Sequence, residues 1–146
     1  MQIRVFEQPE IKHPFAFGGS KEVYQKVKDY AKADREMFII MFLDTCNRVL
    51  ESELHSIGTV NSSPVYPREI FRSALLKNAT SIICVHNHPG GDPTPSEQDK
   101  FMTEEILRGC KLLGIEFLDH IILGGESYYS FADMGNIINP VDKFRL

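Results

Sequence analysis

Two histidines, a proline- and glycine-rich loop and an aspartate follow one another between Val85 and Asp99, in the run VHNHPGGDPTPSEQD. His86 and His88 are one residue apart, so on an extended backbone both imidazoles leave the same face. Asp99 lies three residues after Ser96, where we expect a helix to begin. Two imidazoles and one carboxylate make the ligand set of a catalytic zinc site, whose fourth position stays open for water. The run therefore predicts an enzyme with a metal centre.

The Ser96–Asp99 pair has a second interpretation. Ser-x-x-Asp at the start of a helix resembles a capping box, in which both side chains bond only backbone N–H groups. The two interpretations are compatible, because Ser96 can cap the helix while Asp99 binds a metal and complements the helix dipole. Histidines beside a loop can likewise be surface residues or satisfied hydrogen-bond partners. The fixed order of both histidines, the turn and the Ser/Asp pair favours the metal site.

An apolar strand and a helix are expected to hold these residues. Residues 81–85 predict a short buried strand that runs directly into the histidines. The prolines and glycines of 89–95 exclude regular structure and can return the chain toward the histidines. The helix that starts at Ser96 then faces them, and Gly114 ends it.

The rest of the chain alternates helix and strand signals. A helix is expected over 20–33, with Ser20 as its N-cap, and another begins at Pro67. Apolar runs predict strands over 37–44, 48–58, 115–123 and 128–132. The first two strands are expected to form one hairpin, and the last two a second one. The fold class is therefore α/β (α+β), with a mixed β-sheet flanked by helices.

Composition is that of one ordinary globular domain. The chain has 146 residues, of which 42% are hydrophobic and 25% are charged, enough for a core. A net charge of −4 offers no broad basic surface for nucleic acid. The three cysteines, Cys46, Cys84 and Cys110, form no disulfide pattern. No signal peptide or membrane-length apolar run precedes or interrupts the domain, so we expect a cytoplasmic protein without a membrane partner.

One motif and its flanking segments resemble a known family. His86-Asn87-His88-Pro89, six residues, Ser96, two residues and Asp99 match H-x-H-P-x6-S-x2-D, the signature of JAMM (MPN+) metalloproteases. More narrowly, the chain resembles the RadC-like JAMM domain in the segments LDTCNRVL, GTVNSSPVYPREIF, VHNHPGGDPTPS and DHIILGGESYYSFAD.

This resemblance implies a domain organisation. It predicts a cytidine-deaminase-like JAMM/MPN fold over residues 20–133, with an N-terminal extension at 1–19 and a C-terminal tail at 134–146. RadC proteins often carry an additional N-terminal helix-hairpin-helix segment. Nothing before Lys21 is long enough to supply that segment, so we expect the catalytic domain alone.

The resemblance also implies roles for the motif residues. His86, His88 and Asp99 would be the ligands of Zn²⁺, with water in the fourth position. Ser96 would donate a hydrogen bond to the developing oxyanion. The Asp119–His120 pair belongs to the fold signature of the family, so we expect a hydrogen-bonded structural pair there.

The general base is expected on the second strand. Family enzymes use an upstream glutamate that is hydrogen-bonded to the zinc water, and the family spacing to Gly58 places that glutamate at Glu53. Glu51 lies two residues earlier and shares the same face of the strand, which makes it the rival. In this reaction Glu53 would take a proton from the water and deliver it to the leaving amine.

Three functions compete for this pattern. The leading one is a zinc metallopeptidase that cleaves a peptide or isopeptide bond in a substrate of unknown identity. The alternative is a metal-dependent DNA nuclease or DNA-repair-associated protein, since an activated water also attacks phosphodiesters; the acidic balance does not favour it. A metal-free scaffold ranks lowest, because every signature residue is present. The short connections do not favour specific ubiquitin recognition, and the sequence sets no oligomeric state.

Overall fold

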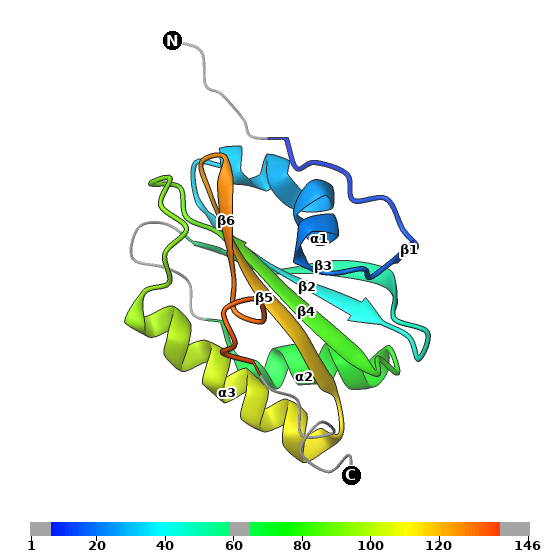
Figure 1. The fold of residues 1–146 in the computed structure, drawn as a ribbon. Coiled ribbons are helices and arrows are strands. Elements are labelled where there is room, and N and C mark those ends of the chain that lie inside the picture. Colours follow the sequence, from blue (N-terminus) through cyan, green and yellow to red (C-terminus); the bar gives the residue numbers. More distant parts are fainter. Residues whose placement is uncertain (1–6, 59–64, 138–146) are drawn as a thin grey trace.

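Six strands form a single sheet that helices cover on both faces (Figure 1). The computed structural model describes residues 7–58 and 65–137. The helices are α1 (Ser20–Val27), the 3₁₀ helix η1 (Lys28–Lys32), α2 (Pro67–Leu76) and α3 (Glu97–Leu113). The strands are β1 (Phe15–Ala16), β2 (Glu36–Leu43), β3 (Arg48–Gly58), β4 (Ser81–Asn87), β5 (Glu116–Gly124) and β6 (Ser127–Ser130). Within these described ranges, no helix combines the length and the apolar character that a membrane span requires.

The sheet is mixed, which confirms the predicted α+β class. Its strand order is β1-β3-β2-β4-β5-β6, and only β4 and β5 run parallel. A parallel pair needs a long crossover connection, and α3 provides it between these two strands. The two predicted hairpins, β2–β3 and β5–β6, are both present. Gly125, at φ 58, supplies the left-handed conformation that the second turn requires.

Two apolar layers explain why the central strands are continuous runs of hydrophobic residues. From Phe38 onward, alternate residues of β2 pack under α2 and α3, whereas those from Met37 onward pack under α1 and η1. β4 contributes to both layers in the same way, and all seven of its residues are buried. A strand covered on both faces shows no polar alternation, so both strands were recognisable from the sequence by their apolar runs.

The first helix differs from the prediction. α1 ends at Val27, and a 3₁₀ turn continues the segment. Gly19, at φ 124, occupies the N-cap position, and Ser20 is the first helical residue. The Ser20 hydroxyl instead donates to the Asp133 carboxylate and lies 3.3 Å from the Tyr128 hydroxyl. Ser20 thus ties the helix to the segment around β6, and its prediction as a cap was wrong.

Three segments far apart in sequence meet at the end of β4. The first residue after the strand, His88, donates its N–H to the carbonyl of Leu123 on β5, at 2.7 Å. The loop that follows lies directly on Gly124, where an added Cβ would be 2.5 Å from the backbone nitrogen of Pro93. Only glycine permits this approach. The β5–β6 turn therefore supports the loop that leads into α3 (Figure 1).

Candidate metal centre

The three predicted ligands converge at the end of β4. One ligand atom from each of His86, His88 and Asp99 lies within 4.8 Å of the others. His86 Nε2 is 3.2 Å from His88 Nε2 and 3.2 Å from Asp99 Oδ1. His88 Nε2 is 3.0 Å from Asp99 Oδ2. The structure brings together two imidazoles and a carboxylate with their donor atoms facing one another.

The end of β4 is fixed by an asparagine between the two histidines. Asn87 Oδ1 accepts a hydrogen bond from the Met37 N–H at 2.7 Å, and Asn87 Nδ2 donates to the Arg35 carbonyl at 3.0 Å. Asn87 is 1% exposed, so no water competes for these bonds. They continue the contact between β2 and β4 beyond the last backbone pair and set the direction in which the histidines leave the strand.

Ser96 and Asp99 form the capping box, and Asp99 also faces the histidines. The Asp99 N–H donates to Ser96 Oγ at 3.1 Å, and the Ser96 N–H donates to Asp99 Oδ2 at 2.9 Å. Both interpretations of the pair therefore hold together, because one carboxylate bonds the helix start and turns toward the imidazoles. A serine hydroxyl that accepts one bond still has a hydrogen to donate. Ser96 lies at the exposed edge of the centre with that hydrogen available.

The Asp99 carboxylate attracts either imidazole when that ring is protonated. Burial raises the pKa of Asp99, but hydrogen bonds from His86 and His88 outweigh it and hold that pKa well below its usual range. The hydrogen bond to Asp99 raises the pKa of His88, against the effect of burial. Within the described ranges, Asp99 makes no ion pair with a lysine or arginine. The negative charge is thus balanced only by groups that can release protons.

Each ligand imidazole has a second partner through its other ring nitrogen. His88 Nδ1 lies 2.8 Å from the Asp92 carbonyl, which only accepts, so Nδ1 carries the hydrogen. His86 Nδ1 lies 2.8 Å from Nε2 of His120. Such outer bonds orient metal-ligating histidines in proteins. With two nitrogen donors, one oxygen donor and these outer partners, the residues present fit a divalent metal such as zinc.

The predicted Asp119–His120 pair is divided between the two faces of the sheet. Asp119 accepts bonds from Ser130 Oγ and from the backbone N–H groups of His120 and Ala132. The His120 ring instead contacts His86, because successive side chains on a strand alternate. The expected hydrogen-bonded pair is present, but its bond runs from the His120 backbone N–H to the Asp119 carboxylate at 2.7 Å and leaves the His120 ring free to contact His86.

Glu53 lies outside the group of three ligands. Its carboxylate accepts a bond from Ser73 Oγ at 2.7 Å and lies 2.9 Å from His55 Nε2 and 3.3 Å from Lys77 Nζ. Glu51 binds the same ammonium at 2.7 Å. Burial raises the pKa of Glu53, but the bonds from Ser73 and Lys77 lower it below its ordinary value. In the part of the chain that the structure describes, no bond or ion pair joins either glutamate to the ligands, and the base role stays a prediction.

Glu36 is the carboxylate that sequence reasoning missed. Phe38 and His86 are the last residue pair between the antiparallel strands β2 and β4, and Glu36 begins β2 two residues before this pair, at the end of the sheet where His88 follows β4. Residues two apart on a strand share a face, and Phe38 stacks on the His86 ring at 5.6 Å between centroids. The negative charge of Glu36 also contributes to the raised pKa of His88. In the sequence, Glu36 is recognisable only as a glutamate at the start of an apolar run. Its proximity to the histidines depends on how β2 and β4 pair, which the sequence does not show.

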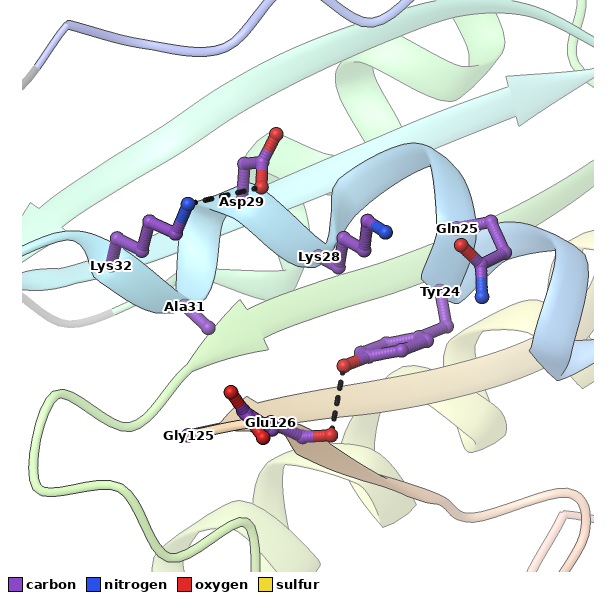
Figure 2. A pocket seen from close by; sticks show the side chains of 8 residues that line it. All are labelled: Tyr24, Gln25, Lys28, Asp29, Ala31, Lys32, Gly125 and Glu126. Atoms are coloured by element: carbon purple, nitrogen blue, oxygen red, sulfur yellow. Dashed lines mark hydrogen bonds and ion pairs between the residues drawn. The ribbon is translucent and has the colours of Figure 1, made fainter.

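A shallow pocket lies elsewhere, between the first helical segment and the β5–β6 turn (Figure 2). It has a volume of about 320 Å³ and contains none of the predicted site residues. The Tyr24 hydroxyl closes one side by donating to the Glu126 carbonyl at 3.0 Å, and Lys32 is neutralised by Asp29 at 3.6 Å. No polar side chain converges on its interior in the way that the three ligands converge, so the metal centre is the stronger candidate.

Comparison with known proteins agrees with this geometry. The RadC-like JAB domain family matches residues 17–136. A "UPF0758 protein" of Methanosarcina mazei is 50% identical over 113 residues, which are 77% of this chain and 48% of that protein. One from Actinobacillus pleuropneumoniae is 48% identical over 100 residues, covering 68% of this chain and 46% of its own length. One from Protochlamydia amoebophila is 43% identical over 130 residues, which are 88% of this chain and 56% of that protein.

The mixed sheet, the His/His/Asp group and these matches define a protein of the JAB superfamily, which includes metallohydrolases. The chain belongs to the family of RadC-like JAB domains. It spans about half the length of the curated relatives that it matches.

Proposed function

We propose that this domain is a zinc-dependent metallohydrolase of the JAMM type that hydrolyses a peptide or isopeptide bond. The observation that carries the proposal is the convergence of His86, His88 and Asp99 with the Nε2 atoms of both imidazoles turned toward the carboxylate. A zinc ion held by these groups would polarise the scissile carbonyl and lower the pKa of a bound water to about 7.

The other residues have separate roles in this proposal. Ser96 lies beside Asp99 and donates its hydroxyl hydrogen to the oxygen that gains charge during attack, which is the kind of stabilisation that oxyanion holes supply. The general base takes a proton from the attacking water and gives it to the leaving amine. Three glutamates compete for that role: Glu53 and its rival Glu51, both on β3, and Glu36 on β2.

We favour Glu36 as the base over Glu53, the glutamate that the family spacing indicates. Glu36 begins β2 at the end of the sheet where His88 follows β4, and its negative charge contributes to the raised pKa of His88. Glu53 is held by Ser73 and Lys77, which favour its ionised form and oppose proton uptake. A base must reach the water directly or through one further water. Glu36 therefore has the better-supported position.

We further propose that the domain works in the cytoplasm. All three cysteines are free in the structure, and two of them, Cys84 and Cys110, are buried among apolar side chains. A reducing compartment suits such thiols.

The test compares Glu36→Gln with Glu53→Gln, and uses Glu104→Gln on the exposed side of α3 as the matched control. Each protein is loaded with zinc, its metal content is measured, and it is challenged with peptide, lysine-isopeptide and DNA substrates. We expect Glu36→Gln to keep zinc and to lose about 10² to 10⁴ in turnover, the usual contribution of a general base. The two other variants should keep wild-type rates.

Each of the remaining outcomes changes the proposal. Loss of turnover in Glu53→Gln alone would transfer the role to Glu53 and overturn the assignment of Glu36. Turnover of DNA without turnover of peptides would replace the peptidase with a nuclease. A wild-type protein that takes up no zinc would refute the metallohydrolase altogether.

A further inference from the structure

We infer that His120 and Thr103 are positioning residues, which together fix the nitrogen that His86 presents to the metal. The inference rests on the proposed metal centre and adds to it one residue from β5 and one from α3. His120 was expected to have a structural role with Asp119. Its ring instead lies between a ligand of the centre and the helix that carries another ligand.

A continuous series of hydrogen bonds connects these groups. His86 Nδ1 lies 2.8 Å from His120 Nε2, and His120 Nδ1 lies 2.6 Å from Thr103 Oγ1. Thr103 Oγ1 then donates to the backbone carbonyl of Asp99 at 2.7 Å. His86, His120 and Thr103 are each at most 3% exposed. Because the series is closed to solvent, each polar atom in it depends on its neighbour in the series.

The carbonyl at one end fixes the direction of every bond. A carbonyl only accepts, and two oxygens 2.7 Å apart need a hydrogen between them, so the Thr103 hydroxyl donates to Asp99. The hydroxyl oxygen must then accept from the N–H at His120 Nδ1. Neutral imidazole carries one hydrogen, so His120 Nε2 has a free lone pair and accepts from the N–H at His86 Nδ1. Whenever the His86 ring is uncharged, its single hydrogen is therefore on Nδ1, and the lone pair of Nε2 faces His88 and Asp99.

Aromatic packing fixes the plane of the His120 ring, and the ring is fully buried. The Phe131 ring stacks on His120 at 4.9 Å between centroids with 10° between the planes, and Phe38 meets it edge-on at 5.7 Å. No carboxylate in the described ranges bonds the His120 ring, and a buried imidazolium without a counter-ion is costly. Phe38 also stacks on His86, so one phenyl ring orients both members of the histidine pair.

Asp99 takes part at both ends of this series of hydrogen bonds. Asp99 provides the carboxylate that faces His86 and also the carbonyl that determines the tautomer of His86. The start of α3 thus sets both the position of one ligand and the bonding state of another. Losing an outer partner of a metal ligand typically costs 10- to 100-fold in metal affinity. We expect that loss when the series is interrupted at Thr103.

Two measurements test the inference. The first is a long-range ¹H–¹⁵N NMR spectrum of the metal-free wild-type protein, in which we expect both His86 and His120 to carry hydrogen on Nδ1. Hydrogen on Nε2 of His120 would overturn the inference. Because no metal is involved, this result does not depend on whether the proposed hydrolase activity exists.

The second measurement is zinc affinity, by competition with a chelator, in Thr103→Val and Thr103→Ser. Valine keeps the shape but has no hydroxyl, so we expect about 10- to 100-fold weaker binding. Serine restores the donor and acceptor and should bind zinc as the wild type does. Equal affinity in both variants would contradict the inference.

A further pair of substitutions separates positioning from packing. His120→Gln offers a carbonyl oxygen that can accept from His86 Nδ1 and should recover part of the affinity, whereas His120→Phe cannot accept and should not. Unfolding in urea is measured alongside, since a packing defect lowers stability in both variants. An affinity that follows stability instead of hydrogen-bonding capacity would overturn the assignment. A wild type that binds no zinc but shows the expected tautomers would refute the metallohydrolase while leaving the hydrogen-bonded series intact.

Discussion

Two groups of charged side chains on the same face of the sheet combine carboxylates with histidine, and they differ in the cation that each carboxylate meets. At the end of β4, Asp99 faces His86 and His88. On β3, Glu51 and Glu53 share the ammonium of Lys77, at 2.7 and 3.3 Å. Imidazolium can lose its proton near neutral pH and then becomes a metal ligand, whereas an ammonium stays charged and has no lone pair to offer. The first group can therefore exchange protons for a metal, whereas the second, which also includes His55, keeps a permanent cation between its two carboxylates.

A third carboxylate, Asp119, completes the comparison, because it meets no cation among the residues that the structure describes. Within those residues it accepts bonds from the Ser130 hydroxyl and two backbone N–H groups. Burial raises its pKa to about 6, since these neutral donors offset the loss of water only in part. Carboxylates in this domain thus differ by their partners. Asp99 faces imidazoles, Glu51 and Glu53 face an ammonium, and Asp119 faces neutral donors.

The largest effect is expected from removing the carboxylate of the metal group. Asp99→Ala deletes one of three ligands, so we expect zinc affinity to fall by more than the roughly 100-fold that loss of an outer partner causes. The helix also loses its capping box, which costs about 1 kcal/mol of stability. The control is Glu97→Ala, an exposed acid in the same helical turn. Equal zinc affinity in both variants, measured by calorimetry, would show that Asp99 is only a cap.

A smaller effect is expected from the carboxylate without a cation. The folded-state pKa of Asp119 lies above its ordinary value of 3.8, so its contribution to stability is present below pH 4 and is lost as the pH rises through about 6. A shift of about two pKa units corresponds to about 3 kcal/mol. Asp119→Asn removes this titration and keeps an oxygen acceptor. The free energy of unfolding of the wild type relative to this variant, from urea denaturation, should fall by about that amount between pH 4 and pH 7.

A difference between wild type and Asp119→Asn that does not change with pH would contradict this account of Asp119. Other carboxylates titrate in the same range, and comparing the two proteins at each pH cancels their contribution.

The smallest effect is expected from the group that contains Lys77. Lys77→Met removes the ammonium that favours the ionised form of Glu53, so the pKa of Glu53 should rise, as followed by ¹³C NMR of its carboxyl carbon. Zinc affinity should stay at the wild-type value. Arg68→Met, on the exposed side of the same helix, is the control. A fall in zinc affinity in Lys77→Met alone would mean that the two groups are not independent.

The grouping of His86, His88 and Asp99 was predictable because the three residues are close together in the sequence. His86, His88 and Asp99 are separated only by a turn whose prolines and glycines can be read directly, and the helix cap that positions Asp99 lies three residues before it. The central strands were predictable for a similar reason, since burial on both faces leaves an unbroken apolar run.

The outer parts of the site depend on how distant strands pair, which no local pattern shows. Glu36 lies at the same end of the sheet as His88 because of the register of β2 against β4. His120 reaches it through the parallel pairing of β4 and β5, and Thr103 through the packing of α3 on that face. Ser20 failed as a cap for a related reason, since its partner, Asp133, comes from the other end of the domain.

The central claim is that one metal binds between His86, His88 and Asp99, and X-ray absorption at the zinc edge of the loaded wild-type protein tests it most directly. We predict one zinc per chain, nitrogen and oxygen neighbours at about 2.0–2.2 Å and the scattering pattern of two imidazoles. Sulfur neighbours at about 2.3 Å would assign the metal to cysteine, and a protein without stoichiometric zinc would have no such centre. Either result would contradict the account.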